Sequence, residues 1–162
     1  MVLGKGKLDP YSYALRLLSL KPRTEKELRD SLKKRGASEE KIEEIITHLS
    51  ELGYIDDNLY AEVFSRFGAR ERKWGRFRLL LEMKKRGIAE EVAEKAVSRY
   101  FSEEEKEEDV LKRALEKRLR MTGPPKDIAQ FKRLYDYLAR KGFPSNLILS
   151  VLAPFKKRLK EE

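Results

Sequence analysis

The amino-acid sequence predicts an all-α fold made of three tandem repeats of three helices each. The first observation is a pattern of helix, glycine and helix that recurs around Gly36, Gly87 and Gly142, at spacings of 51 and 55 residues. The second is that apolar residues recur at spacings of three and four, and no segment alternates as a half-buried strand does. Repetition of similar helical units, each too small to bury its apolar face alone, is typical of a tandem array.

The recurrence covers the helices on both sides of each glycine. When the three glycines are aligned, a basic residue precedes each one, and apolar residues recur upstream and downstream. The aligned sets are Leu28, Leu79 and Leu134; Leu32, Met83 and Leu138; Arg35, Arg86 and Lys141; and Ile45-Ile46, Ala96-Val97 and Val151-Leu152. We therefore expect a flexible tail at 1–8 and repeats at 9–53, 54–101 and 102–162.

The first repeat is predicted to contain helices near 10–20, 25–35 and 39–52. Each has a start signal at its N-terminus, and two of them end at a glycine that can take the left-handed conformation. The start signals are Asp9 with Pro10, the Thr24–Glu27 capping box and Ser38, and the two glycines are Gly36 and Gly53.

The second repeat begins where Asp56 is predicted to cap a helix that starts at Asp57. That helix carries apolar residues on one side, and two further helices are expected near 76–86 and 90–101. The apolar residues of the first of these helices are Leu59, Tyr60, Val63, Phe64 and Phe67.

The third repeat is predicted to begin with a long helix that runs to about residue 121. Ser102 followed by Glu105 has the spacing of a capping box before that helix. The two prolines in Gly123-Pro124-Pro125 prevent its continuation. Two more apolar stripes mark the eighth and ninth helices; they are Ile128, Phe131, Leu134, Tyr135 and Leu138, and then Leu147, Ile148, Val151, Leu152 and Phe155.

The charge of the chain favours an acidic partner. There are 37 Lys plus Arg against 28 Asp plus Glu, a net charge of +9, and nucleic acid is the commonest partner for such a balance. Surface ion pairing in a heat-adapted protein is an alternative reason for so many charges. The chain has no cysteine and no apolar run of membrane-spanning length, so we expect an intracellular, cytoplasmic protein.

The densest positive segment runs from Arg66 to Arg86 and contains nine basic residues and two acidic ones. Basic side chains pair with phosphates and aromatic rings can stack on unpaired bases, so Trp74 and Phe77 are of interest here, although core packing is the favoured role for both. A second basic cluster follows in the seventh helix. The predicted contact residues are Arg66, Arg70, Arg72, Lys73, Trp74, Arg76, Arg78, Lys84, Lys85, Arg86, Lys117, Arg118 and Arg120.

The sequence offers few residues in arrangements that could catalyse a reaction. The single histidine, His48, has no cysteine or second histidine with which to form a metal or nucleophile site, and a structural role is favoured. Asp56 and Asp57 could hold a magnesium ion in a nuclease, but helix capping explains them better. We expect no enzyme activity, no metal and no cofactor.

Several motifs together resemble the RecX family, the bacterial regulators of the RecA recombinase. Each motif alone is only a capped helix, but the ordered set, which spans about 10–155, is specific. Thr24 stands where the family usually has Ser, and Trp74-Gly75-Arg76 replaces a Gly-Pro opening of the fifth helix. The motifs are Ala14-Leu15-Arg16-Leu17-Leu18, Arg23-Thr24-Glu25, Glu27-Leu28, Leu52-Gly53-Tyr54-Ile55-Asp56-Asp57, Tyr60-Ala61 and Leu134 to Phe143.

The resemblance implies an elongated, curved, nine-helix array that lies in the groove of the RecA filament on single-stranded DNA. Such a protein inhibits strand exchange and ATP hydrolysis by RecA, by blocking filament extension or promoting disassembly, within DNA recombination, repair and the SOS response. It is expected to act as a monomer. The main alternative is a helix-turn-helix-like protein acting on duplex DNA, since three-helix units can place a helix in the major groove.

Overall fold

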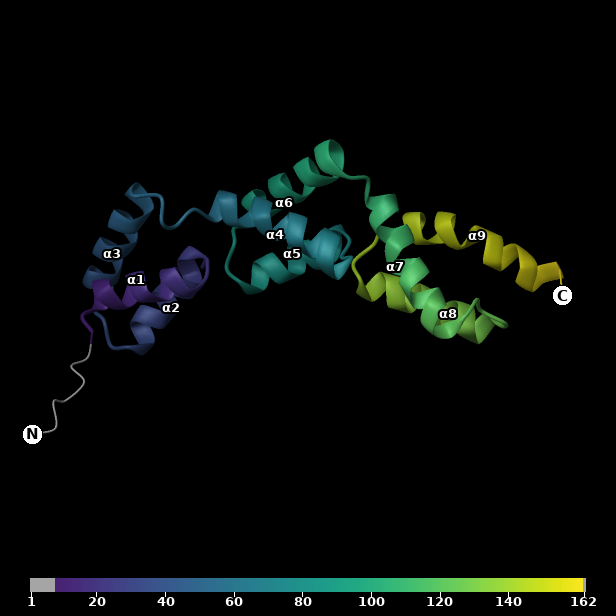
Figure 1. Cartoon of the computed structure of the whole chain (residues 1–162), viewed down its shortest axis with the longest axis horizontal. Coiled ribbons are helices and arrows are strands. Elements are labelled where there is room, and N and C mark those ends of the chain that lie inside the picture. The colour runs from purple at the N-terminus through teal and green to yellow at the C-terminus, as the bar shows by residue number, and fades with distance from the viewer. Residues whose placement is uncertain (1–7, 162) are drawn as a thin grey trace, which may run out of the picture.

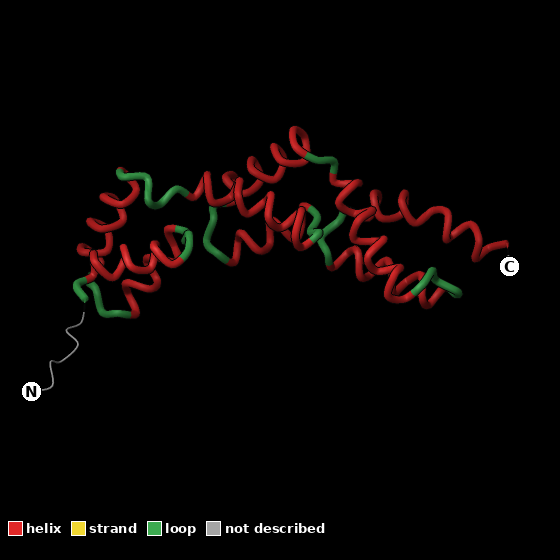
Figure 2. Tube along the Cα trace, viewed as in Figure 1, coloured by secondary structure: helices red, strands yellow, loops and turns green. Residues whose placement is uncertain are grey.

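The computed structural model describes residues 8–161, and these residues form helices without any strand (Figures 1 and 2). No helix within this range is long and apolar enough to cross a membrane. The predicted tail lies, up to residue 7, outside the described residues. The helices are α1 (Pro10–Leu20), α2 (Glu25–Lys34), α3 (Glu39–Glu51), α4 (Asp57–Arg72), α5 (Arg76–Lys85), α6 (Glu90–Arg99), the π-helix η1 (Tyr100–Glu104), α7 (Glu107–Thr122), α8 (Ile128–Arg140) and α9 (Ser145–Glu161).

The α-helices group in threes along one long axis, and the chain of groups bends into an arch (Figure 1). Repeat 1 (α1–α3) and repeat 2 (α4–α6) each have a separate apolar core, and the core of repeat 3 (α7–α9) also takes in Ala69 of α4 and Tyr100 of η1. The predicted all-α fold of three tandem three-helix repeats is thereby confirmed.

Most predicted helix starts are confirmed by side-chain caps. Thr24 and Glu27 form the reciprocal capping box, with Oγ1 accepting from the Glu27 N–H at 3.2 Å and the Glu27 carboxylate accepting from the Thr24 N–H at 3.2 Å. Asp9, Ser38 and Asp56 each accept a bond from a first-turn N–H. These caps depend only on residues three apart, which is why the sequence reveals them.

The capping box predicted at Ser102 and Glu105 is wrong. Both residues are engaged elsewhere, because Ser102 Oγ donates to the carbonyl of Arg99 at 3.1 Å and the Glu105 carboxylate accepts from the Tyr100 hydroxyl at 2.7 Å and from Arg113. The chain passes instead through η1, and α7 begins at Glu107 without a side-chain cap. Other partners nearby in the sequence thus replace the predicted capping box.

The core face of α4 is made of small residues rather than of its large apolar ones. Ala61, Ser65, Gly68 and Ala69 are buried, and a methyl group on Gly68 would lie 2.3 Å from the Leu79 side chain of α5. Large side chains do not fit where helices approach this closely. Consequently Tyr60 and Phe64 are half-buried at the edge of the core, whereas Leu59, Val63 and Phe67 are exposed.

Repeats 1 and 2 are joined at the N-terminus of α2. Thr24 is fully buried, and its hydroxyl donates to the carbonyl of Arg86 at 2.6 Å, while the N–H of Glu25 donates to Asp57 Oδ1 at 3.0 Å. Gly87 lies against Lys26 so closely that a methyl group there would be 2.2 Å from the lysine side chain. The turn before the third helix of repeat 2 therefore rests on the second helix of repeat 1.

Repeats 2 and 3 are joined in the same way at the N-terminus of α5. The N–H of Gly75 donates to the carbonyl of Lys141 at 2.8 Å, and the N–H of Phe77 donates to the carbonyl of Gly142 at 3.0 Å. The N–H of Arg76 donates to Glu107 Oε1 at 2.8 Å, as the N–H of Glu25 does to Asp57. Each joint thus pairs a helix N-terminus with a glycine turn and a carboxylate of the next repeat.

We predict that Gly142→Ala costs more stability than Gly36→Ala. Both glycines have positive φ (+94° and +89°), so alanine adds a strain of about 1–2 kcal/mol at either site. Only at Gly142 does the added methyl group meet backbone, 2.2 Å from the nitrogen of Arg78, whereas nothing lies within 4 Å at Gly36. The extra cost, about 1–3 kcal/mol, is measurable by urea unfolding. Equal losses for the two variants would show that the joint yields freely.

We also predict that Asp57→Asn raises the thermal unfolding midpoint at neutral pH. Burial raises the pKa of the Asp57 carboxyl, and the carboxylates of Glu25, Asp56 and Glu27 raise it further, against the bond from the Glu25 N–H. Stability is therefore highest when Asp57 is protonated and falls as pH rises through the folded-state pKa. Asparagine keeps the acceptor without the charge.

The gain from Asp57→Asn should shrink as pH falls towards 3.8, the ordinary pKa of aspartate. Asp56→Asn is the matched control, because the exposed Asp56 carboxylate caps α4 and its loss brings no gain. A lower midpoint for Asp57→Asn at neutral pH would mean that α4 uses the charge at its N-terminus.

Candidate nucleic-acid interface

The basic segment predicted from the sequence spans the end of α4, a short loop and α5. Lys73 ends α4 in the left-handed conformation with φ of 54°, and the N–H of Trp74 donates to the carbonyl of Gly68 at 3.1 Å. The Trp74 ring is half-buried, with its centroid 6.1 Å from that of Phe64 and the Arg78 guanidinium 5.4 Å away. In contrast, Phe77 is 56% exposed, so only Trp74 takes the core role expected for both aromatics.

Two carboxylates near η1 hold three of the predicted contact arginines. Glu104 binds Arg66 at 2.6 Å and lies 3.6 Å from Arg70. The buried Glu107 binds the Nε of Arg76 at 2.6 Å and also accepts from its N–H. Hydrogen bonding from Arg66 keeps the pKa of the Glu104 carboxyl below its usual range. These arginines therefore have carboxylate partners from sequence positions more than thirty residues away.

A third carboxylate, Glu82 of α5, binds three more of the predicted contacts. Its oxygens lie 3.0 Å from Arg78, 3.2 Å from Lys85 and 3.0 Å from Arg86. Burial opposes ionisation of Glu82, but hydrogen bonds from Arg86 and Lys85 keep its pKa below the ordinary value. This glutamate balances part of the charge on α5, whereas Lys84 is exposed and forms no salt bridge with the described residues.

Four cations without a salt bridge among residues 8–161 meet where repeats 2 and 3 join; we call them the joint cluster. Arg72 and Lys73 come from the end of α4, Lys117 from α7, and Lys141 from the turn before α9. Lys141 Nζ donates to the carbonyl of Arg72 at 2.9 Å. Burial lowers the pKa of the Lys141 ammonium, and Lys117, Lys73, Arg72 and Arg78 lower it further, so these charges act on one another.

Lys141 was not among the contact residues predicted from the sequence. Its place before Gly142, like that of Arg35 before Gly36, indicates a role at the helix end first and any ligand contact second. Only the tertiary joint reveals Lys141 as a candidate. The joint brings the Gly142 turn onto the N-terminus of α5 and places Lys141 beside the end of α4.

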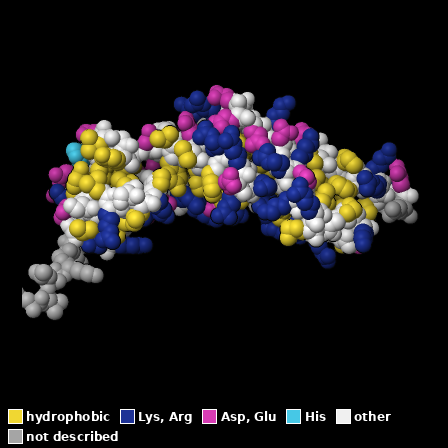
Figure 3. Space-filling model, in the orientation of Figure 1, with side chains coloured by type: hydrophobic (Ala, Val, Ile, Leu, Met, Phe, Trp, Pro, Cys, Tyr) yellow, Lys and Arg dark blue, Asp and Glu magenta, His cyan; other side chains and the backbone are white. Residues whose placement is uncertain are grey.

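A hollow of about 340 Å³ opens beside the joint cluster. Lys73 and Lys117 line it together with Arg113, Arg120 and Glu116, and Glu116 is paired with Arg120. Arg118, also predicted as a contact, lies with its guanidinium 4.9 Å from the centre of the Tyr137 ring, and Lys141 Nζ lies 5.8 Å from the same ring. On the face drawn in Figure 3, lysine and arginine gather over the middle of the arch.

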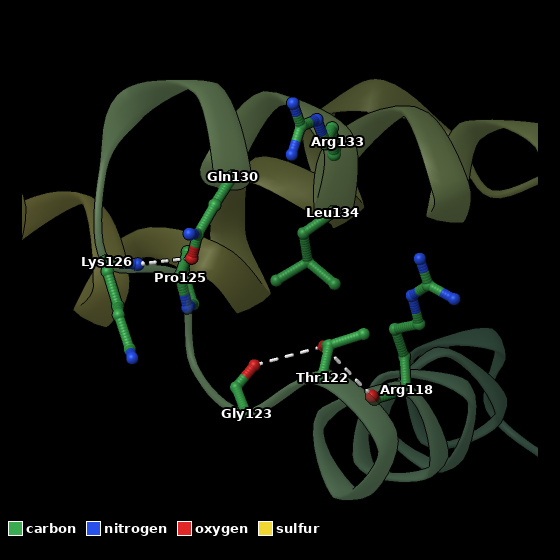
Figure 4. Close-up of a pocket in the computed structure, with 8 residues that line it drawn as sticks. All are labelled: Arg118, Thr122, Gly123, Pro125, Lys126, Gln130, Arg133 and Leu134. Atoms are coloured by element: carbon green, nitrogen blue, oxygen red, sulfur yellow. Dashed lines mark hydrogen bonds between the residues drawn. The ribbon is translucent and has the colours of Figure 1, made fainter.

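Another pocket, of about 270 Å³, lies beside the Gly123–Pro125 segment between α7 and α8 (Figure 4). Arg118, Lys126 and Arg133 line it, but Figure 4 shows their charged ends pointing in different directions. The N–H of Lys126 donates to Gln130 Oε1 at 2.9 Å, so this side-chain oxygen is already engaged. These cations do not converge on a common anion.

The residues considered for catalysis have structural partners. Asp56 caps α4, Asp57 accepts from the N–H of Glu25, and the exposed His48 has its ring 5.6 Å from that of Tyr11. Within residues 8–161, no group of three or more potential ligand residues is placed to hold a metal ion. Capping and packing therefore account for the positions of Asp56, Asp57 and His48.

Comparison with known proteins places this arrangement in a family. The first, second and third three-helix domains of RecX match residues 11–49, 56–97 and 104–152. Regulatory protein RecX of Thermotoga maritima is 37% identical over 143 residues, which cover 88% of this chain and 82% of that protein. That of Amycolatopsis mediterranei is 31% identical over 145 residues, covering 90% and 80%. These relatives are named regulatory proteins, not enzymes.

Solved structures agree with the sequence matches. The crystal structure of RecX from Lactobacillus salivarius has a TM-score of 0.76 at 27% identity and covers 94% of this chain and 96% of that one. With three family domains matched in order along its length, the chain belongs to the RecX family.

Proposed function

We propose that this chain regulates the RecA recombinase by binding the filament that RecA forms on single-stranded DNA. It inhibits strand exchange and ATP hydrolysis by RecA, by blocking filament extension or promoting disassembly, and catalyses no reaction itself. The observation that carries the proposal is the match to three RecX domains in order. The arched array supports it, because tandem repeats present an extended surface suited to another periodic polymer.

The finer features of the proposal follow from the same interpretation. The protein acts as a monomer in the cytoplasm, without cofactor or metal, and its partners are the RecA filament and single-stranded DNA. Its functional units are residues 9–53, 54–101 and 102–162, although the last boundary falls inside η1. Because the net charge is +9, electrostatic attraction steers the protein towards a DNA-containing filament.

Among the predicted contacts, we rank the cations without a salt bridge above the paired ones. A phosphate must displace Glu104 before it can bind Arg66 or Arg70, and it must displace Glu107 before it can bind Arg76. Arg72 and Lys117 need no such exchange. We therefore place the leading electrostatic contacts at the ends of α4 and α7.

The first test titrates the protein into preformed RecA filaments on single-stranded DNA and measures the rate of ATP hydrolysis. We expect a dose-dependent fall at amounts well below one protein per RecA, because a blocked filament end affects many subunits. Binding to bare DNA is followed in parallel. No effect on the filament, together with tight sequence-dependent binding to duplex DNA, would overturn the proposal in favour of a helix-turn-helix-like protein.

A charge reversal tests whether inhibition depends on one of the leading contacts. Arg72→Glu should raise the amount needed for half-inhibition about tenfold, because it places a negative charge among the leading contacts. Lys95→Glu makes the same change of charge on the exposed side of α6, where Lys95 has no salt bridge with the described residues, and should change inhibition little. Equal effects of both variants would show that only net charge matters.

A further inference from the structure

The joint cluster differs from the other charged groups because its members come from two repeats. Arg72 and Lys73 belong to repeat 2, and Lys117 and Lys141 belong to repeat 3. The bonds from the N–H groups of Gly75 and Phe77 to the Gly142 turn hold these two pairs together. Folding therefore brings four positive charges to one place without a salt-bridging carboxylate among the described residues.

Holding these charges together has a cost that an anion would relieve. Like charges repel, and the pKa of Lys141 is lowered first by burial and then by the neighbouring cations Lys117 and Lys73. The ammonium of Lys141 has three donors and uses one of them on the carbonyl of Arg72. Two donors remain, and the neighbouring Lys73 and Lys117 line an open hollow of about 340 Å³.

The chemistry of the cluster favours phosphate groups over an acidic protein surface. Lysine is depleted in protein–protein interfaces, whereas protein–DNA interfaces are strongly positive. Four cations from two repeats lie at the joint and two of them line the open hollow, so a backbone with several phosphates matches their number better than one small anion. The choice of a single strand rests on the proposed function.

We propose that Arg72, Lys73, Lys117 and Lys141 bind the phosphate backbone of single-stranded DNA across the joint, so that a bound strand ties repeat 2 to repeat 3. The strand offsets the repulsion within the cluster and links α4 to α7 by contacts that the protein alone lacks. Occupancy of this site consequently narrows the range of angles between the two repeats, and the arch takes one curvature on DNA.

The site is tested by binding to an oligothymidylate of about 12 nucleotides, followed by fluorescence anisotropy between about 50 and 200 mM salt. The double variant Lys73→Gln with Lys117→Gln should lose about tenfold in affinity and lower the salt slope by about 1.4, because each phosphate contact on a single strand contributes about 0.7. Both lysines lie outside the core, and circular dichroism checks that helical content is retained.

The matched control is Lys156→Gln with Lys157→Gln, which removes the same charge from the exposed end of α9. This control should lower the affinity for the oligothymidylate less than about threefold, because salt screens charges that lie far from the bound strand. Equal losses for the two double variants would overturn the site, since binding would then follow net charge alone. A duplex of the same length that competes equally well would overturn the assignment to a single strand.

The tying of the repeats is tested by a distance measurement. The chain has no cysteine, so Ser98→Cys on α6 and Ser150→Cys on α9, both exposed, allow two spin labels to report on repeats 2 and 3. The oligothymidylate should narrow the distance distribution, and it should not do so in the Lys73→Gln, Lys117→Gln background. Binding without narrowing would overturn the bridging role.

These outcomes are separable from those of the proposed function. Suppose that the protein inhibits RecA filaments but the Lys73→Gln, Lys117→Gln variant loses no affinity for the oligothymidylate. This result would overturn the site and leave the regulator proposal standing. Cluster-dependent binding and narrowing with no effect on filaments would support the site and overturn the regulator proposal.

Discussion

The structure depends on the contact between a glycine turn of one repeat and the N-terminus of the second helix of the repeat before it. At the second joint, Gly142 approaches Arg78 so closely that a methyl group would meet its backbone nitrogen at 2.2 Å. Since glycine has no side chain, the turn can come this close, and its carbonyls accept from the N–H groups at the start of α5. The same contact delivers Lys141 to the end of α4.

Much of the fold could be predicted because its signals are local. Helix caps at Asp9, Thr24, Ser38 and Asp56 depend on residues three apart, and helix ends depend on a single glycine. The second role of Gly87 and Gly142, at the joints, could not be predicted, because their partners lie more than sixty residues away. Ser102 failed as a cap for a different reason, since Glu105 accepts from Tyr100 and Arg113, five and eight residues away, instead of from the Ser102 N–H.

The sequence predicts where the positive segment lies, but it does not predict which of its cations lack a salt bridge. A count of lysines and arginines between Arg66 and Arg86 locates the positive segment, but salt bridges to Glu104 and Glu107 depend on how η1 and α7 lie against α4 and α5. The apolar side predicted for α4 is not its buried side, because close helix packing selects small residues for the core and leaves Phe67 47% exposed.

The joint between repeats 2 and 3 has a consequence for how such proteins diverge. Two of its hydrogen bonds link main-chain groups, which every residue except proline supplies, so the joint restricts few side chains beyond its glycines and the carboxylate of Glu107. Substitutions can therefore accumulate over most of the surface while the repeats keep their relative placement. A chain of this kind can share only 27% of its residues with the RecX of Lactobacillus salivarius and retain the same architecture.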